Sequence, residues 1–247
     1  FLKREKATFS MPETAEEVAR VDGVSREDAD AFAVESHRRA AAAIEAGRFE
    51  REIVPVTVDL GRGRQNLVSV DEGPRPDTTL EVLAGLRPVV AGGSVVTAGN
   101  ASSLNDGASA LLVASGEAAR RHGLTPRARI VTSVAAALAP EIMGLGPVPA
   151  TEKALARAGL TVGDLGSIEI NEAFATQSIA SIRRLGLDPS IVNADGGAIA
   201  LGHPLGSSGA RLLVTLLNRM EREGSRYGLA AMCVGVGQGT ATIIERV

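Results

Sequence analysis

The sequence has few aromatic residues and little net charge, and both shortages bear on nucleic-acid binding. Its 247 residues include five Phe, one Tyr and no Trp. This is too few rings for a stacking platform that binds single-stranded nucleic acid. The formal net charge of −3 gives no support for binding through phosphate neutralisation. We therefore expect no nucleic acid among the partners of this protein.

Cysteine and long apolar runs are also scarce. A single cysteine, Cys233, excludes an intramolecular disulfide and favours a reducing compartment. No apolar run reaches the roughly 18 residues that cross a bilayer. The first ten residues, FLKREKATFS, lack the apolar core of a signal peptide. We therefore expect a cytoplasmic protein without a membrane span. Its scattered histidines and lone cysteine predict no metal site.

What the sequence does have is typical of a packed α/β protein. Hydrophobic residues make up 45% of the chain, and its length allows one or two domains. Beyond Arg127, strand-like and helix-like segments alternate, which predicts a sheet covered by helices. The predicted strands are ARIVTSVAAALA, SIEI, SIVNA, LAAMCV and TATIIERV. The predicted helices are PATEKALARAG, NEAFATQSIASIRRLG and the segment after the glycine-rich loop.

The first half of the chain gives fewer such signals. Residues 25–47 predict a helix that Ser25 caps and Gly47 ends. The segment EIVPVTVDL predicts a strand, and residues 61–81 predict a loop with short strands. His37 and His122 are expected to be solvated, because each lies among polar residues or at a helix end.

Three polar side chains follow predicted strands at regular intervals. Asn171 follows SIEI, His203 lies in the glycine-rich loop after SIVNA, and Cys233 directly follows LAAM. In α/β sheets, ligands bind at the carboxyl ends of the strands. We therefore expect the three groups to meet at one edge of the sheet. The glycines around His203 allow the backbone to approach a ligand closely.

Each of these residues also has a structural interpretation. Asn171 could be an ordinary helix cap, His203 a structural histidine, and Cys233 a small buried hydrophobic residue. The run GVGQGT resembles a dinucleotide-binding turn, but too little chain follows Thr240 for the βαβ unit that such a turn needs.

Three segments resemble the C-terminal signature blocks of thiolases. They are NEAFA, GGAIALGHPLGSSGAR and CVGVGQG, and the resemblance runs from about Met11 to Val247. It implies a thiolase-like α/β fold whose full form stacks five layers, αβαβα. In that fold, residues 1–104 would be a coenzyme A-binding loop domain within the N-terminal half. Residues 105–124 would be the last strand and helix of the N-terminal domain, and 125–247 the C-terminal domain.

The resemblance also implies a reaction and roles for particular residues. Thiolases transfer acyl groups between coenzyme A and acetyl-CoA by cleaving 3-ketoacyl-CoA thiolytically. His203 and a water held by Asn171 would donate hydrogen bonds to the enolate oxygen. Cys233, with a thiol pKa tuned towards neutral, would be the general acid and base, and the Gly235 N–H would bind the acyl-enzyme oxygen. The run SMPETAE looks more like degradative thiolases, including those that act on 3-oxoadipyl-CoA.

Coenzyme A is then a substrate, and no cofactor is implied. Arg75 would meet its phosphates and Ser102 its pantetheine. The other contact residues by resemblance are Met11, Leu86, Ala98, Gly99, Ala173 and Phe174. Family members are usually homodimers or homotetramers, so we expect a homo-oligomer.

The chain departs from the family in one respect. Thiolases carry a nucleophilic cysteine in an N-terminal domain, and this chain has no such cysteine. We therefore expect this chain alone to be inactive. Two alternatives stay open: a catalytically inactive thiolase-like protein that binds lipid or coenzyme A, and a Cys–His hydrolase that uses Cys233 as its nucleophile.

Overall fold

A four-stranded mixed sheet in the order β3–β6–β5–β4 organises the second half of the chain. The computed structural model describes residues 9–247. Residues 1–8 belong to the expected loop domain and to the segment without a signal-peptide core, and they lie outside the described residues. The strands are β1 (Val56–Gly61), β2 (Arg64–Val68), β3 (Ala128–Ala137), β4 (Leu165–Ile170), β5 (Tyr227–Val234) and β6 (Gln238–Arg246).

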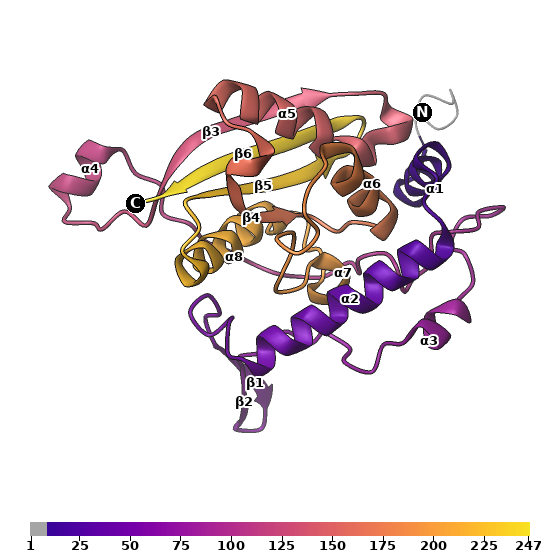
Figure 1. Cartoon of the computed structure of the whole chain (residues 1–247). Coiled ribbons are helices and arrows are strands. Elements are labelled where there is room, and N and C mark those ends of the chain that lie inside the picture. The colour runs from indigo at the N-terminus through magenta and orange to yellow at the C-terminus, as the bar shows by residue number, and fades with distance from the viewer. Residues whose placement is uncertain (1–8) are drawn as a thin grey trace.

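The helices cover both faces of this sheet, with α5 and α6 on one face and α8 on the other (Figure 1). Strand β6 pairs antiparallel with β3 and β5, and β4 pairs parallel with β5. The predicted α/β fold with a mixed, helix-covered sheet is thus confirmed. The helices are α1 (Met11–Asp22), α2 (Arg26–Glu45), α3 (Leu80–Ala84), α4 (Gly116–Arg121), α5 (Pro147–Ala158), α6 (Ala175–Leu185), α7 (Ala198–Leu201), α8 (Ser208–Glu223) and the 3-10 turns η1 (Pro140–Leu145) and η2 (Val162–Asp164).

Side-chain alternation along β5 divides the core between these two helical layers. Leu229 and Ala231 pack into the cluster that includes α5 and α6. Ala230 and Met232 pack against α8. Because successive side chains of a strand point to opposite faces, Cys233 lies on the same face as Ala231. The site-bearing end of β5 therefore faces the α5–α6 layer.

Local signals fix the helix ends where the sequence predicts them. The Ser25 side chain accepts a hydrogen bond from the Asp28 N–H and caps α2. Gly159 and Gly186 end α5 and α6 in the left-handed region, with φ of 65° and 62°. Glycine adopts this conformation without a steric penalty.

Two predicted strands are not formed. SIVNA makes a single parallel bridge, from Val192 to Ile168. The expected last strand of an N-terminal domain, within residues 105–115, has no regular structure. Its apolar side chains are exposed, Leu112 to 80%. A strand needs a hydrogen-bonded neighbour, and none lies beside this segment within residues 9–247. The helix expected after it is present as α4.

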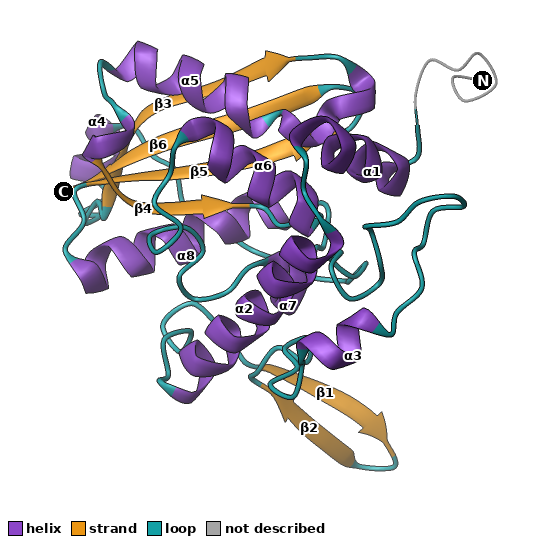
Figure 2. Ribbon diagram, turned by 45° about the vertical axis from the view of Figure 1, so that its right-hand side comes forward, coloured by secondary structure: helices purple, strands orange, loops and turns teal. Residues whose placement is uncertain are grey.

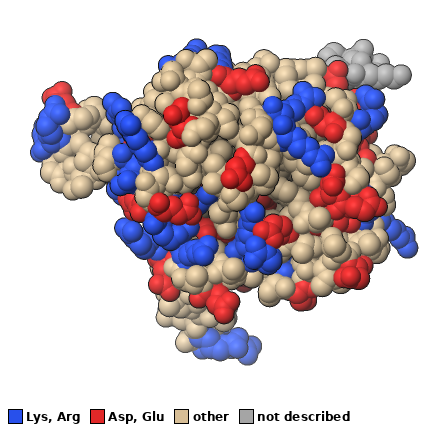
Figure 3. Space-filling view, viewed as in Figure 1, with Lys and Arg blue, Asp and Glu red and all other residues tan. Residues whose placement is uncertain are grey.

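The β1–β2 hairpin projects from the rest of the molecule (Figure 2). Every residue of β1 is exposed, so the hairpin packs on nothing within the described part of the chain. Acidic and basic side chains are interspersed on the face that Figure 3 shows. In residues 9–247, no helix combines the length and the apolar character that a membrane span requires.

One histidine prediction is confirmed and the other is wrong. His122 is exposed at the end of α4. His37, predicted to be solvated, is only 7% exposed. The cause is tertiary: α7 packs against α2, and the chain around Arg75 folds back onto this helix.

Candidate active site

Asn171 lies directly after β4 and is fully buried. Its N–H donates to the Ala231 carbonyl of β5, and its own carbonyl accepts from the Gln177 amide. Helix α6 begins only at Ala175, and its N-cap is Phe174. The interpretation of Asn171 as a helix cap is therefore wrong, and its side chain is free for another task.

His203 meets Asn171 at this edge of the sheet. The His203 Nε2 lies 3.3 Å from Asn171 Nδ2, and His203 Nδ1 lies 2.6 Å from Ser208 Oγ. The Ser208 hydroxyl donates to the Pro204 carbonyl, so it accepts from His203 Nδ1–H. The Nε2 lone pair then accepts from the Asn171 amide. Burial, and secondly the charge of Arg211, lower the pKa of His203, which keeps the ring neutral at pH 7.

The backbone turn before His203 requires glycine. Gly202 has φ of 93°, and a Cβ there would lie 2.4 Å from Asn105 Oδ1. The same Asn105 oxygen accepts from the His203 N–H at 3.3 Å. This glycine therefore allows the histidine loop to lie against the segment around Asn105, as the glycine density of the sequence predicts.

Cys233 lies near the same edge, because β5 runs parallel to β4 and continues past Ala231, the partner of the last β4 residue, as far as Val234. It follows Ala231, the residue that bonds to Asn171, by two positions. Burial raises the pKa of the Cys233 thiol from 9.0 to about 11. A thiol tuned towards neutral pKa is therefore not what this chain contains: the thiol holds its proton throughout the physiological range. Gly235 follows in the turn, where an added Cβ would meet nothing within 4 Å.

One polar atom of Asn171 has no partner. Its Oδ1 is buried and accepts no hydrogen bond from any described residue. Buried polar atoms are nearly always hydrogen-bonded in folded proteins. An acceptor left over beside the His203 imidazole is suited to a bound water or to a polar atom of a ligand.

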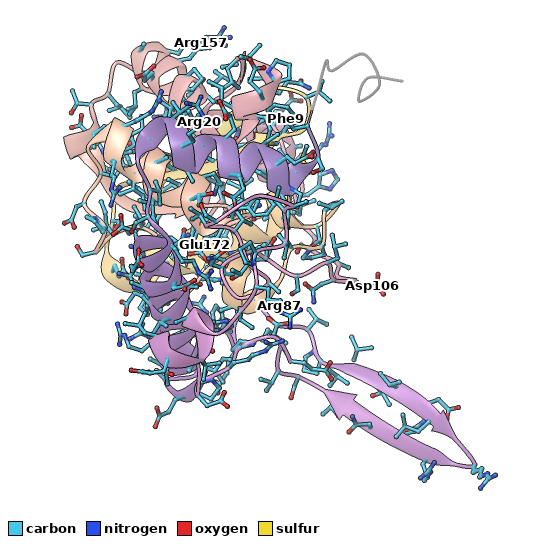
Figure 4. All side chains as sticks on the ribbon, turned by 90° about the vertical axis from the view of Figure 1, so that its right-hand side faces the viewer. Phe9, Arg20, Arg87, Asp106, Arg157 and Glu172 are labelled. Atoms are coloured by element: carbon cyan, nitrogen blue, oxygen red, sulfur yellow. The ribbon has the colours of Figure 1, made fainter. Side chains whose placement is uncertain are left out.

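Glu172 was missed by the sequence reasoning, although it stands next to Asn171. Its carboxylate accepts hydrogen bonds from Ser36 of α2 at 2.6 Å, from Asn193 at 2.8 Å and from the Ile199 N–H at 3.2 Å. A Cβ at Gly197 would lie 2.1 Å from the carboxylate carbon. Figure 4 shows Glu172 in the interior of the molecule. It joins three segments: the Asn171 turn, α2 and the loop that leads to His203.

Burial raises the pKa of Glu172, and the hydrogen bonds from Ser36 and Asn193 oppose that shift. All three of its partners donate, so they suit an anionic carboxylate. The sequence signal for this role was an acidic residue directly after Asn171, in the short loop between β4 and α6.

Most of the expected coenzyme A contacts come together in a second cluster. Ser102 N–H donates to the Ala173 carbonyl, and Ala101 bridges to Phe174. A Cβ on Gly99 would come within 2.6 Å of Leu86. The segment that carries Ala98, Gly99 and Ser102 thus lies against the start of α6. Arg75 lies elsewhere, bonded to α2, and Met11 begins α1.

The sequence matches the models of two protein-family domains. "Thiolase, C-terminal domain" matches residues 124–246, and "Thiolase, N-terminal domain" matches residues 2–117. A relative named beta-ketoadipyl-CoA thiolase from Pseudomonas aeruginosa is 56% identical over 248 residues, covering 100% of this chain and 62% of that protein. The 3-oxoadipyl-CoA/3-oxo-5,6-dehydrosuberyl-CoA thiolase of Escherichia coli K12 is 53% identical, with 97% and 60% covered.

Two solved structures are also similar to this chain. Human mitochondrial 3-ketoacyl-CoA thiolase superimposes with a TM-score of 0.93 at 45% identity, covering 98% of this chain and 62% of that one. Bacillus anthracis acetyl-CoA acetyltransferase has a TM-score of 0.93 at 44% identity, with 97% and 60% covered. The chain thus spans about three fifths of the length of these proteins.

Proposed function

Because this chain belongs to the thiolase family, we propose that it supplies the coenzyme A-binding and acid–base part of a degradative thiolase. The reaction is thiolytic cleavage of a 3-ketoacyl-CoA, a reverse Claisen reaction that yields acetyl-CoA and a shortened acyl-CoA. The observation that carries this proposal is the contact between the Asn171 amide and His203 Nε2 at the edge of the sheet.

His203 would act first as a base. Its Nε2 lone pair would exchange the Asn171 N–H for the thiol of a nucleophilic cysteine that another part of the enzyme provides, and take the proton of that thiol. The thiolate attacks the keto carbon, and the carbon–carbon bond breaks to leave the enolate of acetyl-CoA. The protonated His203 and a water held by Asn171 then donate hydrogen bonds to the enolate oxygen.

Cys233 would act as the acid that completes the cleavage. Its neutral thiol gives a proton to the enolate carbon and becomes a thiolate. That thiolate takes a proton from an incoming coenzyme A thiol. The coenzyme A thiolate attacks the acyl-enzyme and expels the nucleophilic cysteine as a thiolate, which regains its proton from His203. The Gly235 N–H, which no side chain obstructs, would bind the acyl-enzyme oxygen.

The substrate class and the oligomeric state are part of the same proposal. The names of several relatives support 3-oxoadipyl-CoA as the substrate class. Arg75 would contact the phosphates of coenzyme A, Ser102 its pantetheine, and Phe174 would line the acyl tunnel. The domain limits at 104/105 and 124/125, a homo-oligomeric state and a cytoplasmic location belong to this proposal as well.

The test compares this chain alone with a completed enzyme. The stretch of the Pseudomonas aeruginosa relative that this chain does not cover is fused upstream, and cleavage of 3-oxoadipyl-CoA is followed at saturating coenzyme A. We expect activity in the fusion and none in the chain alone. In the fusion, Asn171→Ala or His203→Ala should lower kcat about 10²–10³-fold, the usual cost of losing an oxyanion donor.

Other outcomes favour the alternatives. Thiolysis by the chain alone would contradict the proposed nucleophile. If Cys233→Ser abolishes acyl-enzyme formation in the fusion, Cys233 is itself the nucleophile, as in a Cys–His hydrolase. If it leaves acylation intact but slows turnover, the acid–base role stands. A folded fusion that binds coenzyme A but cleaves nothing would be a binding protein.

A further inference from the structure

His37 lies at the junction between α2 and the segment that joins β2 to α3. Its imidazole is 7% exposed. The His37 Nδ1 accepts a hydrogen bond of 3.1 Å from the backbone N–H of Arg75. The Arg75 carbonyl in turn accepts from both the N–H and the hydroxyl of Thr78, so residues 75–78 form a turn. A side chain of α2 thus anchors the start of this turn.

The other contact of this segment is with α7. A Cβ at Gly73 would lie 2.5 Å from the Ala200 carbonyl oxygen, so the chain there passes directly over α7. Helix α7 leads into Gly202 and His203. The start of the turn of residues 75–78 is therefore held by close packing of Gly73 on α7, the short helix that leads into His203, and by the hydrogen bond from the Arg75 N–H to His37.

That bond requires a neutral ring. A nitrogen that accepts a hydrogen bond carries no proton, so the proton of neutral His37 is on Nε2. The charged groups that face the ring are Arg75 and Asp77, both from the segment it holds. Burial lowers the pKa of His37, Arg75 lowers it further and Asp77 opposes them. The ring is neutral at pH 7 and takes up a proton under acidic conditions.

We propose that His37 is a positioning residue for the turn of residues 75–78, and that protonation of His37 releases this turn and weakens the binding of coenzyme A. This inference rests on the proposed function, which places Arg75 against the phosphates of coenzyme A. A protonated Nδ1 would point its N–H at the N–H of Arg75, so the hydrogen bond is lost. The imidazolium would also lie beside the Arg75 guanidinium, and like charges repel.

The first experiment measures the turn itself in this chain, without any ligand. Hydrogen exchange at the Arg75 amide is compared at pH 7 and pH 5, after correction for the intrinsic exchange rate. Loss of one hydrogen bond should lower its protection about three- to tenfold. The His37→Asn variant keeps an acceptor at the position of Nδ1 but does not titrate, so its protection should stay constant. His122→Gln, which changes an exposed histidine, should behave as the unmodified chain.

Two results would overturn the positioning role. One is a protection of the Arg75 amide that does not change between pH 7 and pH 5. The other is a His37→Asn variant that loses protection at pH 5 as the unmodified chain does. His37→Leu, which lacks any acceptor, should show low protection at both pH values, and its circular dichroism spectrum reports whether it folds.

The second experiment separates this inference from the proposed function. Binding of coenzyme A is measured by calorimetry for the unmodified chain and for His37→Asn at each pH. Comparing the two proteins at one pH cancels the titration of the ligand phosphates. Affinity should fall at least threefold more in the unmodified chain than in the variant between pH 7 and pH 5. Equal falls would overturn the coupling to coenzyme A. If neither protein binds coenzyme A while the exchange result holds, the proposed function fails and the role of His37 in the turn stands.

Discussion

The four-stranded sheet with its covering helices α5, α6 and α8, here called the sheet body, buries its apolar residues. The projecting segments, which are the β1–β2 hairpin and residues 104–113, contain similar apolar residues but expose them. In the body, Leu216 of α8 is fully buried between the helix and the sheet. In the β1–β2 hairpin, Leu67 is 61% exposed, and in the segment after the second site cluster Leu112 is 80% exposed. Residue type therefore does not decide burial in this chain. What decides it is whether a second layer lies against the segment.

The two regions also differ in how polar groups are satisfied. In the body, the Glu172 carboxylate accepts from three segments of the chain. In the hairpin, the hydrogen bonds join β1 only to β2. A lone two-stranded hairpin is marginally stable in water. The body is thus a cooperative unit, while the hairpin contributes little to global stability.

The largest difference between the two regions is expected in the free energy of unfolding, and two matched side-chain truncations test it. Leu216→Ala should lower the free energy of unfolding by about 2–5 kcal/mol, because it leaves a cavity in the core. Leu67→Ala should change it by less than about 0.5 kcal/mol, as for most surface positions. Urea denaturation followed by circular dichroism measures both. Equal losses would mean that the hairpin is packed in solution.

Cys233 is only partly buried, and its thiol tests how strongly the candidate-site end of β5 is shielded from solvent. Its pKa of about 11, against 9.0 without burial, means that the folded chain contains about a hundredfold less thiolate at pH 8. Alkylation by iodoacetamide, read by mass spectrometry, should be slower by that factor in the folded chain than in urea. The rate should rise tenfold per pH unit up to about pH 11.

The same shift has a consequence for stability. Folding favours the neutral thiol, so the unfolded chain loses its proton first as pH rises. The unfolding free energy should decrease between pH 9 and pH 11, and a Cys233→Ala variant should show a smaller decrease. An alkylation rate that levels off above about pH 9 rather than pH 11 would show that the thiol is not buried in solution.

A substitution of Glu172 tests whether the contact between the Asn171 turn, α2 and the loop that leads to His203 needs a charged carboxylate or only a side chain of that shape. Glu172→Gln keeps the size of the side chain but turns one acceptor into a donor, which then faces the Asn193 amide. An unsatisfied buried group costs about 1–3 kcal/mol, and we expect a loss of unfolding free energy in that range. The matched control is Glu81→Gln on the exposed surface of α3, which should change nothing measurable.

The smallest effect is expected at the turn between β5 and β6. Val236 has φ of 65°, a conformation that disfavours β-branched residues. Strain of this kind costs about 1–3 kcal/mol, and glycine removes it at some cost in chain entropy. Val236→Gly should therefore raise the unfolding free energy by about 0.5–1 kcal/mol. A destabilised variant would show that the turn is not strained.

The sequence predicted the body better than the projecting segments, for a physical reason. Helices such as α5 and α6 carry their own periodicity and end at glycines, so local signals suffice. SIVNA looks like a strand, but it makes only one bridge because the chain turns away at Asn193, whose φ is 46°. The strand within residues 105–115 is expected from the family resemblance, but its formation depends on a neighbour that local sequence does not reveal.

The candidate site was predictable to the extent that it follows strand order. Asn171 and His203 meet because the chain around Val192 bridges β4, and Cys233 reaches the same edge on β5. The partners that hold them were not predictable. Ser208 lies close in sequence to His203, but Glu172 acts through Ser36 of α2, which is 136 residues away. His37 was misjudged because its own helix gives no sign that Arg75 folds back onto it.

The segment from Leu104 to Val113, with its exposed Leu104, Leu112 and Val113, has a consequence for handling this chain. Its exposed backbone groups and leucine side chains are a template on which the same segment of another molecule can pair. At high concentration the isolated chain should self-associate through this segment and form precipitates. A lysine introduced in place of Leu112 should keep the chain dispersed, since charged side chains oppose edge-to-edge aggregation.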